Sequence, residues 1–146
     1  GNFEIALNSF PRNDMNISVV TANDFDKDGD VDLFVGSRSV PYNYGVSPVS
    51  YLYINDGKGH FQDVAKQQKT SLSEVGLVTG AIWQDVLGDS NKELIVVGEW
   101  MAPQIFSFSG VRIASPEIVC NSVLIILSAT KSVIFSFDIL KNAIRV

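Results

Sequence analysis

The stretch DFDKDGDVDL, residues 24–33, carries five aspartates within nine positions, one glycine, and the start of an apolar Leu-Phe-Val run. Carboxylates at this spacing repel one another unless a cation neutralises them. Calcium takes about six to eight oxygen ligands from carboxylates and backbone carbonyls. Because alternate residues of a tight loop point inward, we expect side-chain ligands at alternating positions, namely Asp24, Asp26, Asp28 and Asp32. The stretch therefore predicts a Ca²⁺ site.

The remaining residues of the loop fit the same interpretation. Asp30 would supply its backbone carbonyl and leave its side chain in solvent, and Gly29 marks a sharp bend where a positive φ is expected. An EF-hand loop starts in the same way, but it needs a glutamate at its twelfth position and helices on both sides. Here that position is Val35 and the flanks are strand-like, so the EF-hand is excluded. A metal-free acidic turn remains the alternative, since Asp and Gly favour turns.

A second acidic stretch lies 61 positions further along the chain. Residues 24–35 then overlie residues 85–96, with identities at Asp24/Asp85, Asp28/Asp89, Leu33/Leu94 and Val35/Val96. Leu87 replaces the third-position aspartate and Ser90 replaces the glycine. These changes predict a degenerate turn that keeps the shape of the blade. The alternative is a second, weaker metal site formed by Asp85, Asp89, Glu93 and the backbone carbonyl of Asn91.

Short runs of β-branched and aromatic residues, separated by turn formers, predict an all-β fold. A second pair of similar segments, YLYINDGKGHF (51–61) and IFSFSGVRI (105–113), completes a unit of four strands, as in a propeller blade. We expect about two four-stranded antiparallel repeats, about 15–63 and about 78–113 within residues 1–113. A β-sandwich with chance similarity is the alternative.

Residues 114–146 lack an acidic loop and are expected to form a divergent β-hairpin or an altered terminus. Closed propellers need about four to eight blades. The predicted fold is therefore a partial propeller, completed by self-association or by the remainder of a longer chain. The apolar region 118–137 is interrupted by Asn121, Thr130 and Lys131, so two strands are expected there rather than membrane insertion.

Charge and composition narrow the classes of function. A formal net charge of −5 argues against a nucleic-acid partner, which selects a basic surface. The opening segment GNFEIALNSF has no signal-peptide pattern, so the chain is expected to be a mature product or a fragment. His60 is the one histidine and no G-x-S-x-G motif is present, so we expect no enzyme activity. Glu99 is expected to pair with an arginine such as Arg38 rather than to act as a general acid.

Three segments resemble FG-GAP/VCBS repeats, particularly those of bacterial cell-surface VCBS-repeat proteins. They are DFDKDGDVDLFVGSR (24–38), YLYINDGKGHFQDV (51–64) and GAIWQDVLGDSNKELIVVGEWM (80–101), and the resemblance covers about residues 15–113. It implies a β-propeller of the integrin-α type with calcium in hairpin loops, which places the metal roles on the five aspartates of residues 24–32.

The resemblance also implies a non-catalytic module, exported to the cell surface, extracellular space or periplasm, that recognises a protein or carbohydrate. The alternative function is an accessory propeller of a larger polysaccharide-acting enzyme whose active site lies outside this chain. The loop that contains Tyr42 and Tyr44 is a candidate recognition surface, because loops carry binding residues more often than core strands do.

Overall fold

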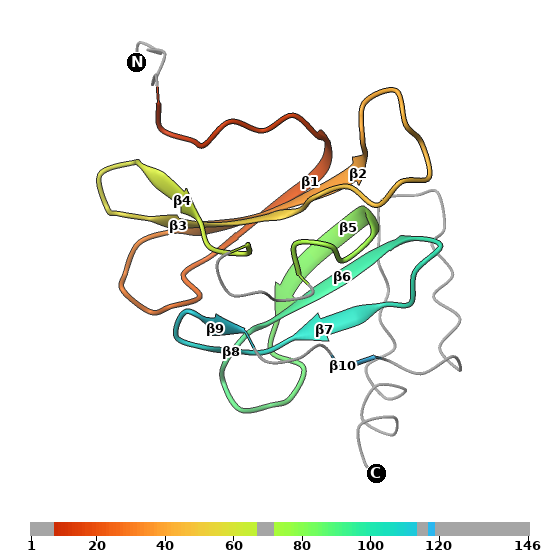
Figure 1. The fold of residues 1–146 in the computed structure, drawn as a ribbon. Helices are drawn as coiled ribbons and strands as arrows, with labels where there is room; N and C mark the ends of the chain where they lie inside the picture. The colour runs from red at the N-terminus through yellow and green to blue at the C-terminus, as the bar shows by residue number, and fades with distance from the viewer. Residues whose placement is uncertain (1–7, 67–71, 114–116, 119–146) are drawn as a thin grey trace, which may run out of the picture.

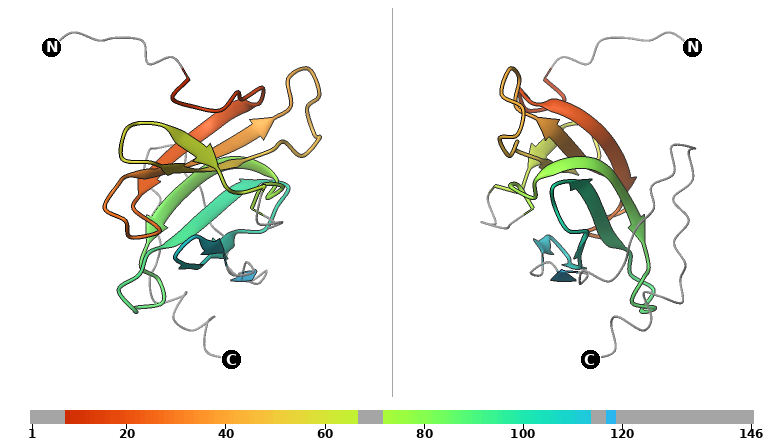
Figure 2. Two further views of the ribbon diagram at one scale, coloured as in Figure 1. Left: turned by 60° about the vertical axis from the view of Figure 1, so that its left-hand side comes forward. Right: turned by 90° about the vertical axis from the view of Figure 1, so that its right-hand side faces the viewer.

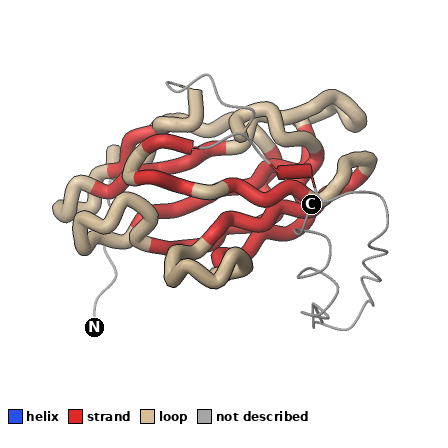
Figure 3. Tube along the Cα trace, turned by 90° about the horizontal axis from the view of Figure 1, so that it is seen from below, coloured by secondary structure: helices blue, strands red, loops and turns tan. Residues whose placement is uncertain are grey.

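The computed structural model describes residues 8–66, 72–113 and 117–118, and within them every regular element is a β-strand (Figure 1). The first sheet contains β1 (Asn16–Asn23), β2 (Asp32–Ser39), β3 (Tyr51–Asn55) and β4 (Phe61–Asp63). The second contains β5 (Leu77–Gln84), β6 (Glu93–Glu99), β7 (Gln104–Phe106) and β10 (Glu117–Ile118). A small hairpin of β8 (Phe108–Ser109) and β9 (Arg112–Ile113) follows β7. The predicted all-β fold is confirmed (Figure 3).

Each large sheet is antiparallel, with its strands in the orders β1-β2-β3-β4 and β5-β6-β7-β10. The 61-residue repeat relates β1 to β5 (16 to 77) and β2 to β6 (32 to 93). The separation falls to 53 at the third strands, because Val35 pairs with Tyr51 and the equivalent Val96 pairs with Gln104. The shorter β6–β7 loop of the second repeat accounts for the difference.

The strand β10 completes the second sheet in the place that β4 occupies in the first. Val64 donates its backbone N–H to the carbonyl of Leu52 at the end of β4, at 2.9 Å. Glu117 pairs with Ile105, and both residues lie 53 positions after that pair (64 to 117, 52 to 105). The fourth strand therefore comes just after residue 113, the predicted end of the second repeat. Apart from β10, the predicted hairpin at 114–146 lies outside the described residues.

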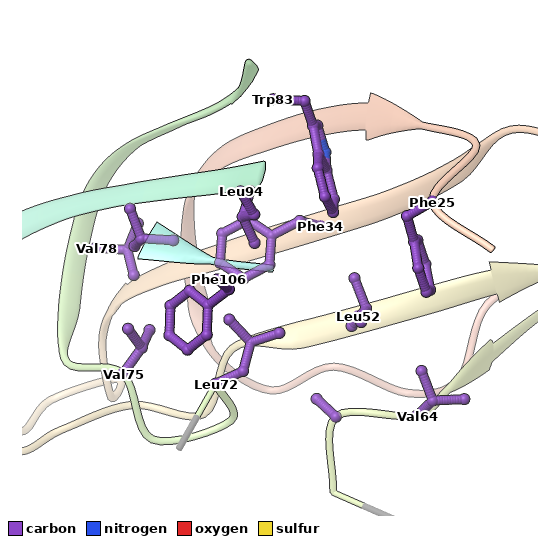
Figure 4. Packing of buried hydrophobic residues seen from close by; sticks show 12 residues of the cluster. Phe25, Phe34, Leu52, Val64, Leu72, Val75, Val78, Trp83, Leu94 and Phe106 are labelled. Carbon is purple, nitrogen blue, oxygen red and sulfur yellow. The ribbon is translucent and has the colours of Figure 1, made fainter. Parts of the chain in front are cut away.

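The main hydrophobic core lies between the two sheets, which face each other in Figure 2. Phe34 and Leu52 contribute to it from the first sheet, and Leu94 and Phe106 contribute from the second (Figure 4). Val96 of the second sheet belongs to the same cluster. All five side chains are fully buried. The strand β5 contacts both β1 and β2, so this core joins the two repeats into one body.

The orientation of equivalent residues distinguishes propeller blades from a sandwich. Leu94 and Val96 belong to the core between the sheets. Their equivalents Leu33 and Val35 instead pack in a separate cluster with Tyr51 and Tyr53. Two sheets related by facing symmetry would bring equivalent faces together. Here the second sheet repeats the orientation of the first, as in successive blades, which favours propeller blades over the sandwich alternative.

The first sheet is covered on its other face by the segment before β1. Phe10 stacks on Phe61 with ring centroids 4.4 Å apart and meets the edge of Tyr53 at 5.7 Å. The N–H of Phe61 also donates to the carbonyl of Ser9 at 2.8 Å.

Within the described residues, no helix is long and apolar enough to cross a membrane.

Candidate metal centre

The first acidic loop connects the paired residues Asn23 and Asp32, at the end of β1 and the start of β2. Two backbone positions are left-handed, Lys27 at φ 66° and Gly29 at φ 97°, and the positive φ predicted for Gly29 is confirmed. The resulting turn gathers the side chains of three aspartates. Asp24, Asp26 and Asp28 each place one carboxylate oxygen within 4.8 Å of the others.

Each of these aspartates uses one oxygen to hold the loop backbone. Asp24 Oδ2 accepts from Gly29 N at 3.1 Å, Asp26 Oδ1 from Asp28 N at 3.3 Å, and Asp28 Oδ1 from Asp30 N at 2.9 Å. The other oxygen of Asp24, Oδ1, is buried and has no hydrogen-bond partner among the described residues. Burying a carboxylate oxygen without a donor or a cation is costly. A positively charged ligand beside that oxygen would remove this cost.

The raised pKa values of Asp26 and Asp32 reflect the cost of burying a charged carboxylate. Burial is the largest cause that raises the pKa of Asp26, and the neighbouring charges of Asp28 and Asp24 raise it further, against a backbone hydrogen bond that lowers it. Burial also raises the pKa of Asp32, partly offset by backbone hydrogen bonds from Asn55 and Phe25. The loop thus concentrates negative charge where the charged carboxylates are poorly solvated.

Asp30 and Asp32 stand apart from the three-carboxylate group. Asp32 is fully buried, and its two oxygens accept from Phe25 N at 3.3 Å and Asn55 N at 3.0 Å, which braces the loop against β3. Asp30 does not extend freely into solvent as expected, because its carboxylate lies where a side chain on Gly57 would stand. Metal ligation by Asp32 and by the carbonyl of Asp30 stays a prediction.

The second acidic loop has the same backbone shape. Gly88 and Ser90 are left-handed at φ 74° and 71°, in the places of Lys27 and Gly29. The hydrogen bonds recur as well, since Ser90 N donates to Asp85 Oδ2 at 3.0 Å and Asn91 N donates to Asp89 Oδ1 at 2.8 Å. The bond from Asn91 is the largest cause that lowers the pKa of Asp89.

The second loop differs in how its carboxylate oxygens are satisfied. Asp85 Oδ1, the counterpart of the buried unbonded atom in Asp24, accepts from Gly88 N at 2.6 Å. Glu93 is buried, and its Oε2 accepts from the backbone N–H groups of Val86 and Leu87. Leu87 supplies no ligand. The geometry brings together no group of three acidic side chains here within the described part of the chain.

A comparison with protein families decides the relationship of this chain. The model of the FG-GAP-like repeat matches residues 24–96, from the first ligand position of the first loop to the middle of β6. The chain belongs to the FG-GAP-like repeat family. No curated protein and no solved structure matches the chain. The matched region contains both acidic loops.

A group of aromatic residues lies at the other end of the FG-GAP-like sheets, because β2 and β6 run from the acidic loops toward it (Figure 1). Arg38 Nη2 donates to Glu99 Oε1 at 2.5 Å, which confirms the predicted pairing, and the hydroxyl of Tyr44 donates to the other oxygen. The hydrogen bond from Tyr44 is the largest cause that lowers the pKa of Glu99. Tyr44 also meets the edge of Trp100 at 5.8 Å.

Two features of the FG-GAP-like loops were not predicted from the sequence. Lys27 Nζ donates to Asn91 Oδ1 at 2.5 Å, so the two acidic loops touch although 64 positions separate these residues. No local pattern signals a contact of this kind. The two loops also carry their glycine at different places. The first has it at position 29, whereas the second has it at position 88, which the 61-residue alignment places opposite Lys27. That exchange indicates two left-handed positions per loop.

Proposed function

We propose that this FG-GAP-like chain is a non-catalytic, calcium-binding β-propeller module that recognises a protein or a glycan outside the cell. The observation that carries the calcium assignment is the group formed by Asp24, Asp26 and Asp28, with the buried Oδ1 of Asp24 lacking a donor among the described residues. An all-oxygen, carboxylate-rich set suits a hard cation such as Ca²⁺. The residues present therefore fit the ion.

In this proposal the ion is a structural part of the blade. It neutralises the mutual repulsion of the three carboxylates and occupies the position next to Asp24 Oδ1. Phe25, the residue between the first two ligands, is buried in the core between the sheets. Because the unfolded chain lacks the assembled site, calcium binding adds to the stability of the folded state in proportion to ln(1 + [L]/Kd).

Extracellular calcium modules use weak sites, with Kd on the order of 10⁻⁴–10⁻³ M, because calcium is abundant outside cells. We expect an affinity in this range. A dissociation constant in the nanomolar range, measured by calorimetry, would instead indicate an intracellular buffer and would argue against export.

The test of the calcium site compares two matched variants. Asp28→Asn and Asp89→Asn each keep an oxygen that accepts the turn hydrogen bond, and they change equivalent positions in the two loops. Thermal unfolding is followed with millimolar calcium and with chelator. We expect calcium to raise the Tm of the parent chain and of Asp89→Asn, but not that of Asp28→Asn. An unchanged parent Tm would show that the first loop is only a solvated acidic turn.

Two arrangements support a recognition role rather than catalysis. The carboxylate of Glu99 is engaged by Tyr44 and Arg38, which lower its pKa, so it is poorly suited to act as a general acid. Tyr42 lies wholly in solvent and Trp100 is 78% exposed. Exposed Tyr and Trp side chains are typical of interface hot spots. The proposal predicts saturable binding of a partner without turnover of it, which calorimetry and product analysis distinguish.

A further inference from the structure

A cleft of about 330 Å³ lies between the two acidic loops and the β8–β9 turn. Its volume falls at the lower end of the range of small-ligand pockets, about 300–1,000 Å³. Three segments that are distant in the sequence line it: residues 23–25 with Lys27, residues 90–92, and residues 108–110. Asp24 is the only member of the candidate metal centre among its lining residues.

Lys27 forms one wall of this cleft by reaching the second loop. Its Nζ donates to Asn91 Oδ1 at 2.5 Å. The lysine occupies a left-handed position, φ 66°, where the second repeat has Gly88. A side chain in that conformation is strained relative to glycine. The chain thus keeps a long polar side chain at a position where glycine fits better, and that side chain builds the cleft.

The cleft combines an aromatic side with polar walls. Phe25 and Phe108 line it and pack against each other at a centroid distance of 5.2 Å. Trp83 packs against both rings, at 6.0 Å and 5.0 Å. The polar residues that line it are Asn23, Asp24, Lys27, Ser90, Asn91, Lys92 and Ser109.

These groups match a saccharide ring, which has apolar C–H faces and several hydroxyls that both donate and accept hydrogen bonds. Amides and hydroxyls serve both roles, and ammonium groups donate. A few convergent polar groups around an apolar surface are the usual composition of a small-ligand site.

The surrounding charge selects among saccharides. The two loops that flank the cleft contain eight acidic side chains, namely Asp24, Asp26, Asp28, Asp30, Asp32, Asp85, Asp89 and Glu93. Lys27, Lys92 and one calcium ion offset only part of that charge. The remaining negative potential disfavours acidic sugars.

We propose that the cleft between the two acidic loops binds one unit of a neutral saccharide. The inference deepens the proposed recognition function, because it names the partner class and its position. It places saccharide binding at the end of the sheets that holds the candidate metal centre, and not at the aromatic residues Tyr42 and Trp100 on the opposite end.

The test is a titration of the calcium-loaded chain with methyl glycosides of glucose, galactose and mannose, followed by backbone amide chemical shifts. We expect saturable shifts at Asn91, Ser109 and Gly110 with at least one of these probes. Ser109→Trp fills the cleft and abolishes the shifts. Lys27→Met removes one polar group and weakens binding about 3- to 10-fold, as expected for the loss of a single hydrogen bond. Lys58→Met, an exposed change in the β3–β4 turn, leaves binding unchanged.

Each outcome separates this inference from the calcium proposal. If calcium raises the Tm but none of the glycosides moves the cleft amides, the saccharide inference fails and the calcium site stands. If galacturonate binds more tightly than methyl galactoside, the charge argument is wrong and the neutral class is overturned. Shifts confined to Tyr42, Tyr44 and Trp100 would move the saccharide site to the other end and overturn the inference as well.

Discussion

Lys27 and Gly88 occupy the same place in the two acidic loops and have almost the same left-handed φ, 66° and 74°. Two residues later Gly29 and Ser90 form a second such pair, at 97° and 71°. Each loop thus has one glycine for two left-handed positions, and the two loops place it differently. The backbone of the turn is conserved between repeats, whereas the residue that relieves its strain is not.

Gly29 and Ser90 occupy the second left-handed position of the first and the second loop. Substituting them is predicted to change the stability of the fold in opposite directions. Gly29→Ala destabilises the fold by about 1–2 kcal/mol through backbone strain alone, because nothing lies within 4 Å of the added Cβ. Ser90→Gly relieves the same strain and stabilises the fold by about 0.5–1 kcal/mol, the relief being offset by the greater entropy of glycine in the unfolded chain.

Urea unfolding of both variants in chelator measures these effects without any contribution from calcium. Stabilisation by Gly29→Ala, or a loss of stability in Ser90→Gly of 1 kcal/mol or more, would contradict the strain argument.

Leu87→Asp is predicted to create a second calcium site. Leu87 stands in the place of Asp26, is 40% exposed, and lies in a loop that already has the backbone shape and the carboxylates Asp85 and Asp89. Without calcium the variant is less stable than the parent, because a third like charge joins the loop. With calcium, calorimetry should count two ions per chain in place of one.

Leu87→Asn is the matched control, since it adds a polar side chain without the charge. If Leu87→Asp still binds a single ion, the hydrogen bond from Gly88 to Asp85 Oδ1 keeps that oxygen from the metal. Combining Leu87→Asp with Asp28→Asn then shows which loop holds the ion.

The sequence predicted the parts of the structure that depend on short-range patterns. The alternating aspartates and Gly29 predicted the turn. The 61-residue repeat predicted that β1 and β2 of the first sheet match β5 and β6 of the second. The repeat weakened at β7, where the separation falls to 53 residues, so the fourth strand of the second sheet lies just after residue 113. A loop of different length shifts every later strand, and the similarity of residues 51–61 to residues 105–113, which start 54 positions apart, was the sequence signal of that shift.

Other features depend on how the two repeats pack, and the sequence could not show them. The buried Oδ1 of Asp24 and the contact between Lys27 and Asn91 arise when separate segments fold against each other. Asp32 looked like one more ligand at alternate spacing, yet its two oxygens accept N–H groups from Phe25 and Asn55. A buried carboxylate beside backbone donors is as well suited to brace a loop as to bind an ion.

Gly36→Ala is predicted to weaken the contact between the two sheets. A Cβ at Gly36 would stand 2.7 Å from Cγ1 of Val19 and 2.7 Å from Cγ1 of Val78, which belongs to the second sheet. Overpacking of this kind costs about 1–3 kcal/mol. Chemical denaturation of the variant should show that loss.

Val78→Ala removes the opposing methyl groups and supplies the control. Alone it destabilises the chain by leaving a cavity. In the double variant the added and removed methyl groups compensate, so the loss is smaller than the sum of the two single effects. Strict additivity would show that Gly36 and Val78 do not touch and that the two sheets are stacked differently.

Tyr53→Phe is predicted to stabilise the chain at neutral pH and to change its stability in alkali. The Tyr53 hydroxyl is buried and has no hydrogen-bond partner among the described residues, so its removal relieves an unsatisfied polar group, by about 1 kcal/mol. Burial is the main cause that raises the pKa of Tyr53 to about 12. The corresponding pKa in the unfolded chain is about 10.

Below pH 10 the hydroxyl is protonated in both states, and the stability associated with this shift is fully present. As the pH rises from about 10 toward 12, the unfolded chain loses the proton first, so the free energy of unfolding falls. Tyr53→Phe lacks this loss, and urea unfolding at pH 7, 10 and 11 measures it. Tyr42→Phe is the control, because that ring lies wholly in solvent in the folded chain and the change leaves the profile of the parent intact. Parallel profiles for Tyr53→Phe and the parent would mean that water reaches the Tyr53 hydroxyl and that the covering segment around Phe10 opens in solution.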